Sequence, residues 1–187
     1  MNEDIKKAVE ILNKGGIILY PSDTIWGLGC DATNKDAVAK LYKIKKRNSE
    51  KSMLILLNNI GLIYSYVELV PETAFDIIDL SEKPVTVIFP GAKNLAENLL
   101  AADGSIGIRI TKEKFTNTLL QKFKKPLVST SANFTGEKTP LTFNEISEDI
   151  KQAVDYVVKY NQDDLSAGTT SSIIKIGINN KIKVIRE

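Results

Sequence analysis

Apolar residues recur along several segments with the period of an amphipathic helix. Residues 5–12 carry apolar side chains three to four positions apart, which predicts a helix near the N-terminus. The same spacing predicts three further helices, at 37–44, 74–78 and 115–123. A hydroxyl followed three residues later by a carboxylate predicts two helix starts, Thr33 with Asp36 and Thr142 with Glu145.

Short apolar runs, of the length typical of strands, lie between these helical segments. They occupy residues 17–20, 53–57, 85–89, 106–110, 127–128, 156–158, 172–176 and 182–185. Because strands and helices intermix without a repeat or a low-complexity linker, we expect an α+β fold. It would be an open mixed β-sheet flanked by helices, in one domain spanning residues 1–187. The longest loops, 134–142 and 160–168, are of a kind that often closes over a site.

The composition excludes much ordinary enzyme chemistry. The chain has 187 residues, one cysteine and no histidine. A Ser-His-Asp or Cys-His arrangement therefore cannot form, zinc ligands are lacking, and no disulfide can close within the chain. A lone cysteine fits a reducing cytoplasm, and no apolar run approaches the ~18 residues of a membrane span. We expect a cytoplasmic protein without a membrane segment or a protein-held metal.

The cations are unevenly divided between lysine and arginine. Of 25 basic residues, only Arg47, Arg109 and Arg186 are arginine, and the net charge is +2. Arginine differs from lysine in its planar fork, which binds phosphate or carboxylate through two hydrogen bonds. Three arginines could also be scattered by chance. The small net charge gives no argument for nucleic-acid binding by itself.

Three dense runs of small polar residues adjoin predicted strands, at 21–24, 129–133 and 169–172. Ligands usually bind at strand ends of an open sheet, and Ser, Thr and Asn side chains hydrogen-bond phosphate, ribose or an amino acid. Turn and cap chemistry explains any one run equally well. Together, the three runs favour a polar pocket.

A basic group follows the second predicted helix. Its members are Lys43, Lys45, Lys46, Arg47 and Lys51. Cations at a helix C-terminus also offset the helix dipole, which explains the lysines better than the arginine. No Walker motif is present, and Gly27-Leu28-Gly29, a fragment of a dinucleotide-binding pattern, is interpreted as a tight turn.

The polar runs, taken in order, resemble the YrdC-like family of threonylcarbamoyl-AMP synthases over nearly the whole chain. The matching motifs are PSDTIWGLG at 21–29, Lys45-x-Arg47, IGIR at 106–109, STSAN at 129–133 with Gly136, and SSII at 171–174. The resemblance implies a twisted open sheet with a large basic concave face. It also implies a nucleotidyltransferase that makes L-threonylcarbamoyl-adenylate and pyrophosphate from L-threonine, bicarbonate or CO2, and ATP, for threonylcarbamoyladenosine modification of tRNA.

The resemblance also assigns residues. It places ATP at Lys45, Arg47, Lys51, Ser105, Ser129, Ser131, Asn133, Thr139 and Arg186. It places threonine at Thr24, Arg109 and Ser171. Lys45 and Arg47 are expected to be catalytic, stabilising the triphosphate together with Mg2+. The attacking carbamate brings its own negative charge, so the reaction needs no histidine as a base.

Two other functions fit the same pattern. The first is a binding module of this fold for double-stranded RNA or tRNA, without synthase activity. The second, a carbamoyl-transfer domain of hydrogenase maturation, normally lies within a much larger chain. The combination of Lys45, Arg47, Ser131 and Asn133 favours the synthase, because lysines alone suffice for an RNA backbone. Such a synthase would act with tRNA-modification partner proteins.

Overall fold

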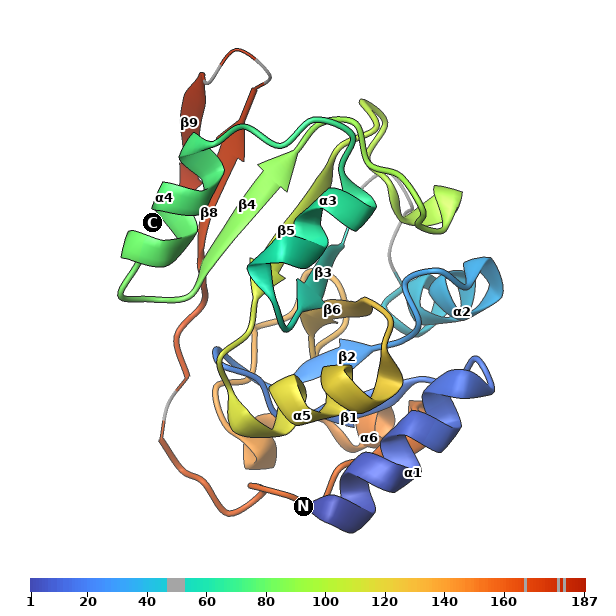
Figure 1. Cartoon of the computed structure of the whole chain (residues 1–187). Helices are drawn as coiled ribbons and strands as arrows, with labels where there is room; N and C mark the ends of the chain where they lie inside the picture. Colours follow the sequence, from blue (N-terminus) through green and yellow to red (C-terminus); the bar gives the residue numbers. More distant parts are fainter. Residues whose placement is uncertain (47–52, 167, 178, 180) are drawn as a thin grey trace.

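The computed structural model describes residues 1–46, 53–166, 168–177, 179 and 181–187. These residues form a sheet of nine strands in the order β7-β1-β2-β6-β3-β5-β4-β8-β9 (Figure 1). The strands are β1 (Ile18–Tyr20), β2 (Gly27–Gly29), β3 (Leu54–Leu57), β4 (Val85–Phe89), β5 (Ile106–Ile110), β6 (Leu127–Ser131), β7 (Tyr156–Val157), β8 (Ser172–Ile176) and β9 (Ile182–Arg186).

The sheet mixes both strand directions. The pairs β1–β7, β3–β5 and β4–β8 are parallel, and the other neighbours are antiparallel. This confirms the expected mixed sheet flanked by helices. One interpretation was wrong: residues 27–29 form the strand β2 between β1 and β6 instead of a tight turn. Glycine has a low strand propensity, so only the pairing on both sides reveals this strand.

The helices are α1 (Asn2–Asn13), α2 (Lys35–Ile44), α3 (Ile63–Tyr66), α4 (Thr73–Leu80), α5 (Lys114–Phe123) and α6 (Glu148–Ala153). Single 3-10 turns lie at η1 (Ile60–Leu62), η2 (Glu97–Leu99) and η3 (Phe143–Glu145). In the described ranges, none of these helices is both long and apolar enough to cross a membrane.

Both predicted capping boxes were wrong in detail. Asn34, one residue after Thr33, caps α2 by accepting hydrogen bonds from the Asp36 and Ala37 amides at 3.0 Å. The Thr33 hydroxyl instead donates to the Asp31 carboxylate at 2.6 Å, because an ionised carboxylate is the stronger acceptor.

The second box lies one turn too early. Thr142 precedes only η3 and makes no side-chain cap, while the Glu145 carboxylate accepts from the Leu141 amide at 3.0 Å. The helix α6 begins after Ser147, whose hydroxyl accepts from the Ile150 amide. Both errors are shifts along the chain, since several residues in each segment have capping side chains.

The two faces of the sheet carry two separate hydrophobic cores. On one face, α1 and α5 pack against β1, β3 and β6 through a core that includes Ile5, Leu12, Leu56, Phe115 and Leu119. These two helices lie side by side in Figure 1. The larger core on the other face includes residues of α2, α3, α4 and α6. Alternation within β3 divides its residues accordingly, with Leu56 in the first core and Ile55 and Leu57 in the second.

Candidate functional site

A cavity of about 260 Å³ lies on the same face of the sheet as α1 and α5, over a part of the sheet that these helices do not cover. Its floor crosses four strands. The register pairs Ser129 with Leu54, Leu54 with Gly107, and Gly107 with Ile88, and all four residues line the cavity. Since strand residues two apart share a face, Leu56 packs under α5 while Leu54 opens into the cavity.

Gly107 keeps this floor open. A Cβ atom at this position would lie 3.2 Å from Thr86 Cγ2 and 3.3 Å from Leu54 Cβ, which is tighter than ordinary packing. The floor thus combines the small or polar residues Gly107, Thr86 and Ser129 with the apolar Leu54 and Ile88. The polar Thr86, between Val85 and Val87, lines the cavity and was not predicted. Its signal in the sequence was a hydroxyl inside an apolar strand.

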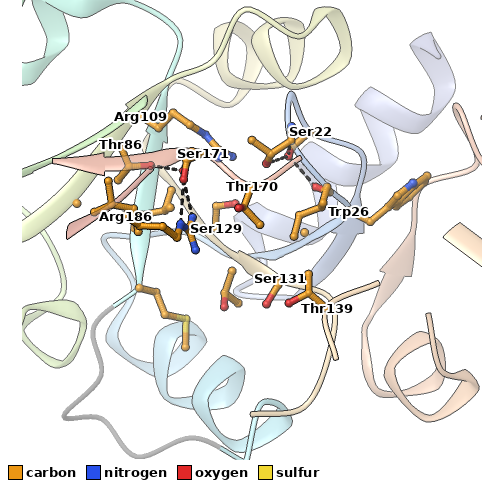
Figure 2. Close-up of a pocket in the computed structure, with 18 of the residues that line it drawn as sticks. Ser22, Trp26, Thr86, Arg109, Ser129, Ser131, Thr139, Thr170, Ser171 and Arg186 are labelled. Carbon is orange, nitrogen blue, oxygen red and sulfur yellow. Dashed lines mark hydrogen bonds between the residues drawn. The ribbon is translucent and has the colours of Figure 1, made fainter. Parts of the chain in front are cut away.

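The loop between β1 and β2 forms one wall. The Ser22 hydroxyl donates to the Ile25 carbonyl at 2.7 Å and lies 3.0 Å from the Thr24 hydroxyl. These bonds hold the loop as a turn, and both Ser22 and Thr24 line the cavity. Figure 2 shows Ser22 on the cavity side. Trp26, in the same wall, packs on Phe143 with ring centroids 4.8 Å apart.

Arg109 provides a buried positive charge on β5. It is 4% exposed, and its Nη2 lies 3.2 Å from Oδ1 of Asp23. Burial raises the pKa of Asp23, and the Arg109 charge opposes that rise. Among the described residues, Arg109 Nε is a buried donor without a hydrogen-bond partner. An arginine oriented in this way, with an unused donor, suits a carboxylate or phosphate ligand.

Arg186 and Ser171 come from opposite ends of the C-terminal hairpin region and meet at the cavity. The Nε and Nη2 atoms of Arg186 donate to the Ser171 carbonyl at 3.1 and 2.7 Å. The Ser171 hydroxyl lies 2.9 Å from that of Thr86. Figure 2 shows Arg109, Thr86 and Ser171 on one side of the cavity and Ser131 and Thr139 on another. The Arg186 guanidinium thus binds the backbone carbonyl of Ser171 in this structure.

Lys45 lies behind the cavity wall. It is 2% exposed, and its Nζ donates to the Ser131 carbonyl at 2.6 Å, the Asn133 carbonyl, and Asn133 Oδ1 at 3.2 Å. The Ser131 hydroxyl also donates to Asn133 Oδ1. One buried ammonium therefore holds the turn after β6 and fixes the position of Ser131.

The fold brings together most of the predicted site residues. Those that line the cavity are Thr24, Arg109, Ser129, Ser131, Thr139, Ser171 and Arg186. Lys45 and Asn133 lie behind Ser131, and the Ser105 hydroxyl donates to Asp103 at 2.5 Å. Arg47 and Lys51 lie outside the described residues. Ser22 and Thr170 also line the cavity; they belong to the polar runs predicted to form a pocket, without an assigned role. Trp26, from the matching motif at 21–29, lines it too, whereas Thr86 was missed.

The cavity is lined by hydroxyl groups, which can donate hydrogen bonds, and by the buried guanidinium of Arg109. Hydroxyls from two strands, β4 and β6, and from three loops can bind oxygen-rich ligands, and Arg109 favours those with negative charge. In the described part of the chain, no three Cys, Asp or Glu side chains are close enough together to hold a metal ion. The fold and site define a class: open mixed-sheet proteins with a hydroxyl-lined cavity and a buried guanidinium on the sheet face.

Comparison with known proteins identifies the family. The chain belongs to the Sua5/YciO/YrdC family, whose sequence model, described as "Telomere recombination", matches residues 10–187. A protein of Pseudoalteromonas translucida named threonylcarbamoyl-AMP synthase is 34% identical over 95% of each chain. Among solved structures, E. coli YciO has a TM-score of 0.86 at 24% identity, covering 100% of this chain and 90% of its own. P. abyssi Sua5 complexed with L-threonine has a TM-score of 0.82 at 19% identity, covering 92% and 50%.

Proposed function

We propose that this protein is a threonylcarbamoyl-AMP synthase. It would combine L-threonine, bicarbonate or CO2, and ATP into L-threonylcarbamoyl-adenylate and pyrophosphate. The observation that carries the proposal is the buried Arg109, with an unused Nε donor, in a hydroxyl-lined cavity. The relative that shares 34% identity over 95% of each chain, and is named for this activity, supports it.

The threonine end of the cavity is assigned to Arg109, Thr24 and Ser171. Arg109 would bind the threonine carboxylate, because a guanidinium with a free donor matches a planar carboxylate. Thr24 and Ser171 line the same cavity and offer hydroxyls to the amino acid. P. abyssi Sua5, which has the same fold, forms a complex with L-threonine, and this supports a threonine site here.

The ATP end is assigned to the hydroxyls around Ser129, Ser131 and Thr139 and to Arg186. We propose that Lys45 acts through the turn that it holds, by keeping Ser131 and Asn133 in place. Ser105 is farther removed, because its hydroxyl is bound to Asp103. Arg47 and Lys51 remain proposed phosphate ligands on the resemblance alone.

The chemistry requires positioning more than proton transfer. The carbamate oxygen of the substrate attacks the α-phosphorus, the new P–O bond forms, and the bond to pyrophosphate breaks. The attacking group is already an anion, so no histidine is needed to deprotonate it. Mg2+ would arrive with the ATP phosphates, where it neutralises charge, since the described residues offer no carboxylate cage.

The proposal includes a cytoplasmic protein whose product is consumed by tRNA-modification partner proteins. The alternative of an RNA-binding module without synthase activity is not favoured. Relatives named as synthases match most of the chain, the first of them over 95% of it. Salt-dependent binding of duplex RNA without ATP chemistry would reverse this preference.

The decisive experiment measures pyrophosphate release from ATP by the purified protein. We expect release that requires both L-threonine and bicarbonate, with the adenylate detected by mass spectrometry. Omitting either substrate is the matched control. Release that is indifferent to threonine and bicarbonate would contradict the proposed function.

A further inference from the structure

Tyr20 makes a hydrogen bond to a cavity residue from two strands away. It is the last residue of β1 and is fully buried, and its hydroxyl donates to Ser129 Oγ at 2.8 Å. Ser129 belongs to β6, and β2 lies between β1 and β6 in the sheet. The Tyr20 side chain therefore has to cross a strand to reach its partner.

The glycines of β2 make this crossing possible. Gly27 and Gly29 are two residues apart, so their missing side chains leave a gap on the same face of the strand. A Cβ atom at Gly29 would lie 2.8 Å from Tyr20 Cε1, closer than carbon atoms approach. A Cβ atom at Gly27 would lie 3.4 Å from both Tyr20 Cε1 and Ser129 Oγ. The Tyr20 ring fills this glycine gap.

The direction of this hydrogen bond constrains the Ser129 proton. A phenol is a better donor than an aliphatic hydroxyl, and burial raises the pKa of Tyr20, so the phenol keeps its proton. Ser129 Oγ accepts the hydrogen bond from the phenol, so the O–H of Ser129 must point toward another acceptor. Within the described residues, the Ser129 hydroxyl donates to no protein acceptor, and Ser129 lines the cavity. Its proton is free for a ligand.

We propose that Tyr20 is a positioning residue that holds the Ser129 hydroxyl as a donor to an anionic oxygen of the bound substrate. The role rests on the proposed function for the identity of that substrate. Phosphate and carboxylate oxygens share the required chemistry, with ATP and the carbamoylated threonine as the two sources. The Gly27-Leu28-Gly29 motif is the structural condition for the contact, because any side chain on Gly29 would displace the ring.

The test is a double-mutant cycle of Tyr20→Phe and Ser129→Ala, measured by pyrophosphate release. We expect Tyr20→Phe to lower kcat/KM about 5- to 10-fold, the effect of one neutral hydrogen bond, and Ser129→Ala at least as much. The double variant should match Ser129→Ala within about twofold, because Tyr20 acts only through Ser129. Losses that multiply in the double variant would overturn the proposal, as would wild-type kcat/KM in Tyr20→Phe.

Tyr156→Phe is the matched control. Its hydroxyl donates to Asp4 Oδ1 at 2.6 Å, far along the chain from any cavity residue, and Tyr156 does not line the cavity. It should keep wild-type kcat/KM. If Tyr20→Phe does not fold, Ser129→Ala alone decides, since wild-type activity in that variant contradicts a substrate contact at Ser129.

Two readouts separate this inference from the proposed function. The first is the Michaelis constant that increases in both single variants. An increase in the KM for ATP or in the KM for threonine identifies the substrate that supplies the oxygen. The second needs no turnover. Ser129→Ala leaves the buried Tyr20 hydroxyl unpaired, so adding Tyr20→Phe should restore part of the lost thermal stability.

If the wild type makes no adenylate, the proposed function fails, and calorimetric titration with ATP and with threonine tests the inference. Both single variants should then weaken binding of the same ligand. Unchanged affinity for both ligands would overturn the role of Tyr20, and so would a stability loss in the double variant that equals the sum of the two single losses.

Discussion

Two cationic side chains, Arg109 and Lys45, are buried at or behind the cavity. Arg109 faces Asp23 and keeps one donor unused, whereas Lys45 donates to oxygens of Ser131 and Asn133. The two cations therefore differ in what they offer a ligand. We expect Arg109 to bind it directly and Lys45 to act through the turn that it stabilises. The family resemblance implied that both are site residues, but their different environments arise from the packing around them.

Arg109→Lys should raise the KM for threonine about tenfold or more, with a smaller effect on the KM for ATP. Lysine keeps the buried charge beside Asp23 but loses the planar fork that binds a carboxylate with two donors. The measurement is pyrophosphate release at varied threonine, with thermal unfolding as the check on folding. An unchanged KM for threonine would remove Arg109 from the threonine site.

Lys45→Met should reduce both stability and activity. The methionine fills similar space, but the Ser131 and Asn133 oxygens lose their donor, which costs about 2 kcal/mol in the free energy of unfolding. Chemical denaturation measures this loss. The control is Lys7→Met, because Lys7 is half exposed on α1 and its ion pair with Glu10 contributes little. Equal stability of the two variants would contradict the role of Lys45.

At the scale of elements, the loop between β1 and β2 and the segment before β8 form adjoining walls of the cavity. Gly168 lies so close to the loop that a Cβ atom there would be 1.9 Å from the Thr24 carbonyl oxygen. The segment therefore packs backbone against backbone beside the part of the cavity that we propose binds threonine. This contact places the end of loop 160–168 beside Thr24, a residue that lines the cavity. That the loop closes over the site stays a prediction.

Gly168→Ala should separate these two walls. The new methyl group cannot fit against Thr24, so we expect a loss of about 1–3 kcal/mol in the free energy of unfolding and a higher KM for threonine. Gly61→Ala is the control, since its Cβ would meet only the Asn59 side chain. If Gly168→Ala behaves like Gly61→Ala in both assays, the close contact is not needed.

A carboxylate links β8 to the turn before β5. Asp103 accepts hydrogen bonds from Lys175 and Ser105, which lower its pKa from the ordinary 3.8 to about 2. A carboxyl with a lowered pKa stabilises the fold above pH 4, and this contribution is lost as the pH falls toward 2. Asp103 is half exposed, so solvent reduces the effect.

Lys175→Met should therefore raise the pKa of Asp103 toward 3.8, because the Lys175 ammonium is the largest cause of its lowering. An NMR titration of the Asp103 side-chain carbon measures this shift directly. The acid-unfolding midpoint should move to slightly higher pH. A pKa that stays near 2 would show that the Ser105 hydroxyl and amide suffice.

At the scale of the molecule, one sheet joins elements from both ends of the chain. β1 pairs with β7, and β4 pairs with β8, so residues near the start and end of the sequence share the same hydrogen-bonded structure. The cavity takes residues from β2, β3, β4, β5, β6 and β8, and no local segment contains it. Its shape depends on the whole sheet.

We expect one cooperative unfolding transition, which would also test the single domain expected for residues 1–187. Trp26, the only tryptophan, lies near one end of the sheet, so its fluorescence reports on that end while circular dichroism reports on all elements. The two denaturation curves should coincide, and ATP with threonine should shift both to higher denaturant. Two separated midpoints would show independently folding parts.

The sequence alone determined most of the helices and strands, although not β2, and the mixed sheet, and its resemblance to a known family implied the class of chemistry. The spacing of apolar residues depends only on neighbouring positions in the sequence. The absence of histidine excludes a histidine base without reference to the structure. Tertiary structure decided which polar residues meet. Lys45 bonds to Ser131, 86 positions away, and Tyr20 to Ser129, 109 positions away. Such contacts depend on strand order and register, which bring together residues that no local pattern relates.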